Sequence, residues 1–190
     1  MTIIAAIKEP GVSRVWIGSD TQSTYNERRC HSGPKWVLAH GWALGWAGFH
    51  RAGNLAAAHS DALFTDLADP EDFVRRWSKV LADEGWNSGT GAGPKDYGCD
   101  FLLACPTAIY DIDCAFAISP TPDGQLGAVG NGAKTALGCA FGLNGLASPQ
   151  VILRRSVEAA CAIIEGCGGE PYFDALQEMH QHESIMAVSA

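Results

Sequence analysis

The sequence of 190 residues is poor in charge, and especially in basic residues. Only 18% of its residues are charged, and 13 lysines and arginines stand against 21 aspartates and glutamates, which gives a net charge of −8. Binding the phosphate backbone of nucleic acid requires a basic surface, so we expect no nucleic-acid partner. The low charge fits an oligomer that covers part of its surface, and it equally fits a compact monomer.

The long apolar runs of membrane proteins are also missing. No run approaches the roughly 20 apolar residues of a membrane-spanning helix, and the apolar start of the chain is far too short for a signal peptide. With 47% hydrophobic residues, the chain can bury a core and is not a disordered sequence. We therefore expect a single domain over residues 1–190 and no membrane partner.

The spacings of metal sites and disulfide frameworks are absent as well. The seven cysteines are scattered, mostly within apolar runs, and none forms a CxxC pair. The histidines fall on different predicted elements, at spacings that match no ligand pattern. We expect free, mostly buried thiols in a reducing cytoplasm, with no metal and no cofactor.

What the sequence does contain is groups of strands alternating with groups of helices. Runs of β-branched and apolar residues between turn formers predict strands at 2–8, 15–19, 35–39, 42–48, 99–105, 108–114 and 171–176, and a strand that breaks into a helix over 128–141. Apolar residues at helical spacing predict helices at 52–67, from Pro70 to Leu81 with Asp69 as N-cap, and from Ser148 to Glu165. The remaining segments, 26–34, 85–98 and 115–125, are predicted loops or turns. Grouped elements of this kind indicate a layered α+β domain.

The first strand brings chemistry to the N-terminus. Removing Met1 would leave Thr2 with a free α-amine beside its own hydroxyl, so one residue would hold both a nucleophile and a base. Strands 2–8 and 15–19 are predicted to form a hairpin that turns at residues 9–11. Because Thr2 opens this hairpin and Asp20 closes it, both are expected at the same end of a sheet.

Two further residues are expected near this end. Lys35 opens the third strand, where its charge would disfavour protonation of the Thr2 amine, and Asp20 would balance that charge and fix its position. Gly48 closes the next strand, where backbone N–H groups are suited to hold the oxyanion of a tetrahedral intermediate.

The order and separation of these residues resemble those of the proteasome β-type subunits, and most closely the bacterial HslV and Anbu. The likeness covers nearly the whole chain and is carried by Thr2-Ile3-Ile4, the segment 18–24, Lys35, the segment 44–49 and the segment 128–132. It implies a four-layer αββα sandwich and an N-terminal-nucleophile hydrolase. It also implies a peptide or unfolded-protein substrate, a homo-oligomeric ring that encloses the sites, and an ATPase that unfolds the substrate.

The resemblance also implies roles for individual residues. Thr2 would attack the scissile carbonyl with its own amine as general base, Lys35 would tune that amine, and Asp20 would support Lys35. The Gly48 N–H would hold the oxyanion, with Gly45 as a nearby alternative. Ser23 and Thr24 would bind an extended peptide through backbone hydrogen bonds, as an added strand.

Two positions differ from the usual pattern of the family. Asn131 stands where the family usually has a serine, and an amide cannot relay a proton as a hydroxyl can. The segment Gly166-Cys167-Gly168-Gly169 stands where the family often has an aspartate and a serine that support the threonine, so this support is either absent or supplied by backbone groups. Two alternatives to a threonine peptidase therefore stay open: a non-catalytic assembly or binding protein, and a small-molecule amidase on the same scaffold.

Overall fold

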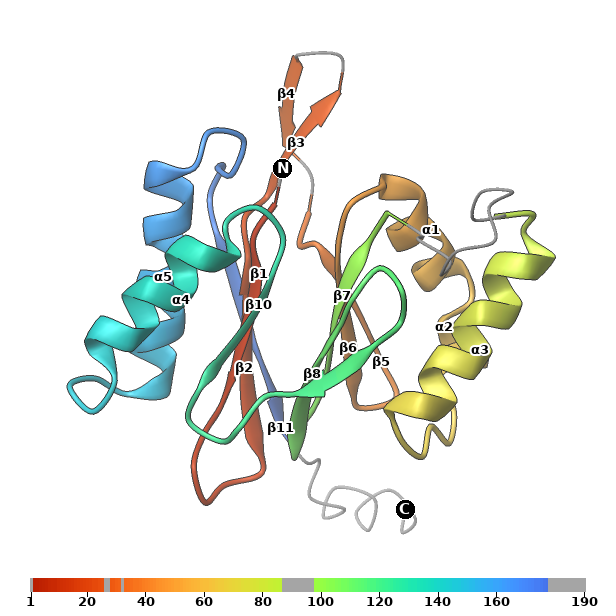
Figure 1. The fold of residues 1–190 in the computed structure, drawn as a ribbon, viewed down its shortest axis with the longest axis horizontal. Helices are drawn as coiled ribbons and strands as arrows, with labels where there is room; N and C mark the ends of the chain where they lie inside the picture. The colour runs from red at the N-terminus through yellow and green to blue at the C-terminus, as the bar shows by residue number, and fades with distance from the viewer. Residues whose placement is uncertain (1, 26–27, 32, 87–97, 178–190) are drawn as a thin grey trace, which may run out of the picture.

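A computed structural model describes residues 2–25, 28–31, 33–86 and 98–177 of the chain. Two antiparallel sheets face each other in the middle of the molecule, and the helices lie on the two outer sides (Figure 1). The predicted α+β class is confirmed. Most of the predicted loop 85–98 lies outside the described residues.

The first sheet is built on the N-terminal hairpin, as predicted. Strand β1 (Ile4–Lys8) pairs with β2 (Arg14–Ser19), and the sheet order is β10-β1-β2-β11, with β10 at Leu126–Val129 and β11 at Tyr172–Gln177. Ile4 lies opposite Ser19 on one side and Val129 on the other. The start of β1 and the ends of β2 and β10 therefore lie side by side at one end of the sheet.

The second sheet has the order β5-β6-β7-β8-β9. Its strands are Trp36–Ala39, Trp42–Ala47, Asp100–Cys105, Ala108–Ile112 and Ile118–Pro120. The predicted turn between β5 and β6 is confirmed at His40 and Gly41, whose positive φ angles of 52° and 78° suit a tight hairpin. The short strand β9 occupies part of the segment that the sequence predicts as turns.

A third pair of strands corrects the sequence prediction for residues 26–34. We expected a loop there because charge and turn formers are frequent. Instead β3 (Gln22–Tyr25) and β4 (Arg28–His31) form a two-stranded hairpin, with Gln22 opposite His31. Alternating polar residues can pair in a hairpin that projects from the body of the protein, so low hydrophobicity does not exclude strands.

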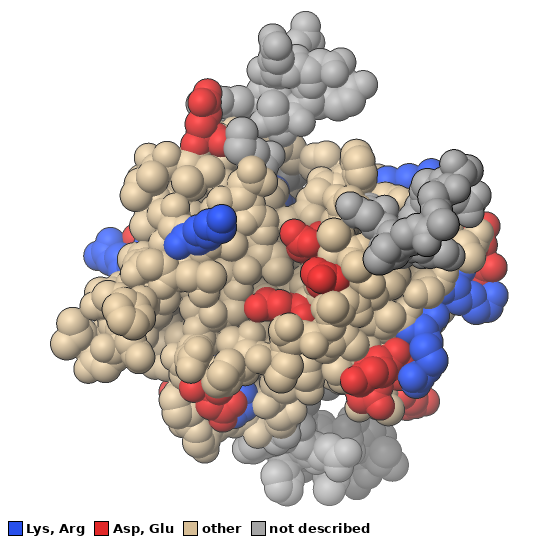
Figure 2. All heavy atoms as spheres, in the orientation of Figure 1, with Lys and Arg blue, Asp and Glu red and all other residues tan. Residues whose placement is uncertain are grey.

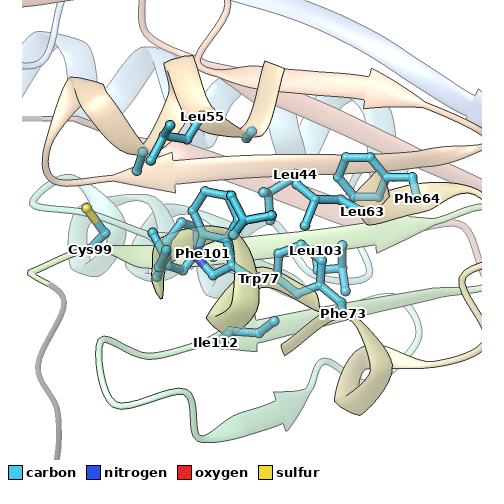
Figure 3. Close-up of a cluster of buried hydrophobic side chains, with 14 of the residues drawn as sticks. Leu44, Leu55, Leu63, Phe64, Phe73, Trp77, Cys99, Phe101, Leu103 and Ile112 are labelled. Carbon is cyan, nitrogen blue, oxygen red and sulfur yellow. The ribbon is translucent and has the colours of Figure 1, made fainter. Parts of the chain in front are cut away.

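The second sheet is covered by α1 (His50–Ala58), α2 (Ser60–Phe64) and α3 (Pro70–Asp83). The sequence predicted one helix over 52–67, but the chain bends at His59 and continues as α2. Asp69 caps α3 as predicted, since its side chain accepts the Asp72 N–H. Buried aromatic and aliphatic side chains from these helices and from β7 pack into one cluster (Figure 3), which includes Leu63, Phe64, Phe73, Trp77, Phe101 and Leu103.

The first sheet is covered by α4 (Ala133–Leu143) and α5 (Pro149–Ile163). Ser148 caps α5, because its hydroxyl accepts the Val151 N–H. None of the described helices is long and apolar enough to cross a membrane.

Strand β1 is buried on both faces, which explains its almost continuous apolar run. Successive side chains of a strand point to opposite faces. Ile4 and Ala6 pack against the second sheet, whereas Ala5 and Ile7 pack against α4 and α5. The N-terminal strand is therefore held between the two halves of the fold, and its first residues are fixed in position.

Candidate active site

The site lies at one end of the two facing sheets, where strands of both sheets begin or finish. The first sheet brings Thr2, just before β1, and Asp20, just after β2. The second sheet brings Lys35, just before β5, and Gly48, just after β6. Asn131 follows β10 at the same end.

Thr2 is partly buried, and its backbone is fixed by the turn after β10. Its carbonyl accepts the Gly132 N–H at 3.1 Å. Gly130 has a φ of 93°, and a β-carbon there would lie 2.5 Å from the Thr2 carbonyl oxygen. Glycine at position 130 thus lets the turn approach Thr2 closely.

Lys35 joins the two sheets at this point. Its Nζ donates to Thr2 Oγ1 at 2.6 Å, to Asp20 Oδ1 at 2.7 Å and to the Gln22 carbonyl at 2.6 Å. Only 4% of Lys35 is exposed, and Asp20 is fully buried. Two buried opposite charges at this distance compensate each other, and the ammonium group is left directed at the Thr2 hydroxyl.

Backbone groups from separate elements hold Asp20. Its Oδ1 also accepts the Ile3 N–H at 3.1 Å, and its Oδ2 accepts the Gly168 N–H at 3.2 Å. The Ser19 hydroxyl donates to the Asp20 carbonyl at 2.8 Å and accepts the Lys35 N–H at 3.2 Å. The carboxylate is therefore bonded to the residue after Thr2 and to the segment after α5, which fixes its orientation.

Thr2 and Gly48 line two cavities together. The larger, of about 460 Å³, is also lined by Ala47, Gly98, Asp100, Gly130 and Asn131. The smaller, of about 80 Å³, is also lined by Gln22, Ser23, Lys35, Trp46 and His50. A substrate carbonyl placed at Thr2 would therefore have space on both sides, with the Gly48 backbone beside it.

A third cavity, of about 290 Å³, shares Asp100 with the larger one and is also lined by Asp111 and Asp113. Figure 2 shows acidic side chains gathered in the hollow in the middle of this face. Burial raises the pKa of Asp111 to about 6.

The structure brings most of the predicted site residues together, but it places Gly45 elsewhere. Gly45 lies within β6, where a β-carbon would be 2.6 Å from a methyl carbon of Ile4 in the facing sheet. Gly45 thus lies against the sheet interface and lines neither Thr2 cavity. Thr24 lies in β3 opposite Arg29, and its side chain is outside the described residues.

Sequence reasoning missed contacts made by Ser19, Gln22 and Gly168. Gly168 donates to Asp20, and its carbonyl accepts the Thr21 and Gln22 N–H groups at 3.1 and 2.9 Å. The signal for Gly168 was the glycine-rich segment 166–169, where backbone could replace a side chain. The Gln22 contact with Lys35 is made by its carbonyl, which every residue type carries, so no sequence pattern reveals it.

Two cysteines close to Asp20 are protonated thiols. Burial, together with the charge of Asp20, raises the pKa of Cys167 to about 11 and that of Cys161 to about 12. A thiol with so high a pKa is a poor nucleophile. Among the described residues, no three histidine, cysteine or acidic side chains form a group that could hold a metal ion.

No protein-family profile and no curated protein matches this sequence. Solved structures do. The chain is similar to Thiobacillus denitrificans BPH at 16% identity and a TM-score of 0.76, over 93% of this chain and 98% of that one. The same protein in complex with epoxomicin gives a TM-score of 0.78 with the same identity and coverage.

A structure of eukaryotic HslV from Trypanosoma brucei is also similar, at 16% identity and a TM-score of 0.65, over 93% of this chain and all of that one. The chain has a proteasome β-type, HslV-like fold. The resemblance inferred from the order of sequence motifs is thus confirmed for the fold. The HslV-like fold spans nearly the whole length of the similar proteins, so the likeness is not limited to one local motif.

Proposed function

We propose that this chain is an N-terminal threonine peptidase that hydrolyses peptide bonds with Thr2 after removal of Met1. One observation carries the proposal: the buried Lys35 ammonium lies 2.6 Å from the Thr2 hydroxyl and 2.7 Å from the buried Asp20 carboxylate. A lysine and an aspartate buried together are costly to keep, and here the aspartate holds the lysine while the lysine is directed at the hydroxyl of Thr2.

In the proposed reaction, Thr2 Oγ1 attacks the carbonyl carbon and its proton passes to the free Thr2 amine. The Lys35 charge stabilises the developing alkoxide, and the Gly48 N–H binds the oxyanion. The C–N bond then breaks, and the Thr2 ammonium gives the proton to the leaving amine. Water hydrolyses the ester left on Oγ1, with the Thr2 amine again as base, and the hydroxyl is restored.

The wider architecture supports this class of enzyme. Two facing sheets with helices on both outer sides fit the four-layer αββα sandwich of N-terminal-nucleophile hydrolases, built as a single domain over residues 1–190. The six cysteines from Cys99 to Cys167 form no disulfide, which fits a cytoplasmic protein.

We propose that an extended peptide binds beside β3, paired to the backbone of Ser23 and Thr24. Ser23 lines the smaller Thr2 cavity, and among the described strands β3 pairs with β4 alone. An extended peptide can join a strand as an additional strand, and beside β3 it would lead the scissile bond to Thr2. Asn131 lines the larger cavity and could donate a hydrogen bond to the part of the substrate bound there.

We also propose a homo-oligomeric ring that encloses the sites, with an ATPase that unfolds protein substrates. Apolar side chains on and after α4 support self-association, because Phe141 is 86% exposed and Leu146 is 81% exposed.

The intact mass of the purified protein, before and after treatment with a peptide epoxyketone, tests the proposed function. This reagent needs both the threonine hydroxyl and its free amine. We expect loss of Met1 and a single adduct, and no adduct on Thr2→Ala, which should keep the same oligomer. A Thr2→Ala variant that still hydrolyses peptides would overturn the assignment of the nucleophile.

The other outcomes select the alternatives. Retained Met1 with no adduct would favour a non-catalytic assembly protein. An adduct without peptide turnover would favour a small-molecule amidase. Met1 removed with no adduct would direct attention to Asn131 and to the segment 166–169.

A further inference from the structure

The corner that carries Gly48 is packed directly against the start of β7. Gly48 has a φ of 136°, and a β-carbon at this position would lie 2.3 Å from the Gly98 carbonyl oxygen and 2.7 Å from Cys99 Sγ. No other residue type could occupy the corner without moving backbone. The position of the Gly48 N–H is therefore set by what holds residues 98 and 99.

Cys99 is bonded to this corner through its sulfur. The Phe49 N–H donates to Cys99 Sγ at 3.1 Å, and the thiol is 2% exposed. Figure 3 shows Cys99 at the start of β7, at one end of the buried cluster beneath α1. The sulfur is thus fixed by the core, and it fixes the peptide group that joins Gly48 to Phe49.

This contact separates the roles of two adjacent amides. The Phe49 N–H is engaged by sulfur and is not free to bind an oxyanion. The Gly48 N–H precedes it on a residue that lines both Thr2 cavities. The Gly48 N–H belongs to the 47–48 peptide group, which is joined to the 48–49 group at the Gly48 α-carbon by the φ and ψ rotations of that residue. The bond to Cys99 Sγ holds the 48–49 group, and the close packing of Gly48 on Gly98 and Cys99 restricts these two rotations, so that the Gly48 N–H keeps its direction.

We propose that Cys99 is a positioning residue for the oxyanion donor at Gly48. It does not touch the substrate; it acts by holding the 48–49 peptide against β7. This inference rests on the proposed function, since a donor needs positioning for catalysis only if Thr2 forms a tetrahedral intermediate beside it. A preorganised donor contributes more to the rate than one that must reorient during the reaction.

The test compares Cys99→Ala, which removes the acceptor, with Cys99→Ser, which keeps one. Cys105→Ala, at the other end of β7, is the matched control. Two quantities are measured on each folded variant: kcat and KM for a fluorogenic peptide, and the rate of hydrogen exchange at the Phe49 amide. Removal of a whole oxyanion donor costs about 10²–10³-fold in kcat, so a loosened donor should cost about 10-fold.

We expect Cys99→Ala to lower kcat about 10-fold with KM changed less than about 2-fold, and to speed exchange at Phe49. Cys99→Ser should keep most of the wild-type kcat and most of the protection of the Phe49 amide, and Cys105→Ala should match wild type in both quantities. A Cys99→Ala variant with wild-type kcat, or with unchanged exchange at Phe49, would overturn the proposal. An equal rise in KM would also overturn it, because that indicates a general loss of binding.

The two arms separate this inference from the proposed function. Should the wild-type protein form no epoxyketone adduct and turn over no peptide, the proposed function fails and catalytic positioning fails with it. The hydrogen-exchange measurement at the Phe49 amide would then still decide whether Cys99 fixes the 48–49 peptide group. If Cys99→Ala does not fold, Cys99→Ser decides. A serine variant with the wild-type exchange rate at Phe49 and the wild-type kcat supports the role of an acceptor at this position. A serine variant with faster exchange and a lowered kcat contradicts it.

Discussion

At the scale of single residues, the proposed mechanism depends on the buried Lys35–Asp20 pair. The two charges are removed from water and are compensated by each other and by backbone groups. Removing one partner of a buried pair leaves the other unpaired, which costs about 3–5 kcal/mol, whereas replacing both by uncharged residues is often nearly neutral.

This difference allows catalysis and stability to be separated. We expect Lys35→Met to abolish turnover and to lower the free energy of unfolding by about 3–5 kcal/mol. The double variant Lys35→Met/Asp20→Asn should regain most of the stability and none of the activity. Urea unfolding and peptide turnover measure the two effects. Wild-type turnover in Lys35→Met would remove Lys35 from the mechanism.

Asp111 provides a prediction about pH. Its folded pKa of about 6 lies above the unfolded value of 3.8 because burial disfavours the charged form. The carboxylate is therefore destabilising above pH 6, and this penalty disappears as the pH falls through 6 toward 4. Asp111 Oδ1 is enclosed and has no hydrogen-bond partner among the described residues. Asp100 and Asp113, which line the same cavity, offer no positive charge to compensate it.

We expect Asp111→Asn to unfold with a free energy about 1–2 kcal/mol higher than wild type at pH 8, after allowance for the partial exposure of the side chain, and to match wild type near pH 4. Urea unfolding at the two pH values measures this. Asp66→Asn, at an exposed position, shows the effect of losing one carboxylate alone. A difference between Asp111→Asn and wild type that is the same at both pH values would contradict the assigned cause.

At the scale of elements, the separation of the two sheets depends on Gly45. An alanine there would place its β-carbon 2.6 Å from Cγ2 of Ile4, which is fully buried. We expect Gly45→Ala to destabilise the fold by about 1–3 kcal/mol through overpacking. Gly138→Ala is the matched control, since nothing lies within 4 Å of the added carbon on exposed α4 and alanine favours a helix. A stable Gly45→Ala variant in urea unfolding would contradict this account.

The same elements show how far the sequence could predict the fold. The hairpins β1–β2 and β5–β6 were predictable because apolar runs flank short turns, and the start of α3 because Asp69 and Pro70 form a cap. The break at His59 was not, because the apolar spacing continues from α1 into α2, and buried residues of both helices pack into the same cluster. The β3–β4 hairpin was missed because its strands are polar.

The site divides along similar lines. Thr2, Asp20, Lys35 and Gly48 could be placed together because each stands at the end of a predicted strand, and strand ends meet at sheet edges. Gly45 shows the limit of that reasoning. A glycine within a strand can allow the close approach of either a ligand or a facing sheet, and the sequence does not distinguish the two. Gly168 bonds to Asp20 through its backbone N–H, and only the folded structure shows that these two residues are neighbours.

At the scale of the whole molecule, the exposed apolar side chains of α4 and the following turn bear on the proposed ring. Leu137, Phe141 and Leu146 are 42%, 86% and 81% exposed, and Leu137 and Phe141 stand four residues apart on α4, on the same face of the helix. We expect Phe141→Glu to shift the protein from an oligomer toward a monomer, because a charge would have to be buried in the interface. Size-exclusion chromatography with light scattering measures the shift.

Val12→Glu is the control, because it places the same charge on a half-exposed apolar residue at the turn between β1 and β2. It should assemble as wild type does. A wild-type protein that is a clean monomer at micromolar concentration would count against the ring. A Phe141→Glu variant that assembles normally would place the contacts elsewhere.

The way Thr2 is anchored has a consequence for when the protein could act. Its carbonyl is held by Gly132, and the next amide, at Ile3, is held by Asp20. Both contacts lie on the C-terminal side of Thr2, so cleaving the bond before it leaves them intact. On the proposed mechanism the folded chain is a latent enzyme with its hydroxyl, ammonium and carboxylate already aligned. Activation would then be a purely chemical event, the release of one amine, timed by the removal of Met1 and not by a rearrangement of the fold.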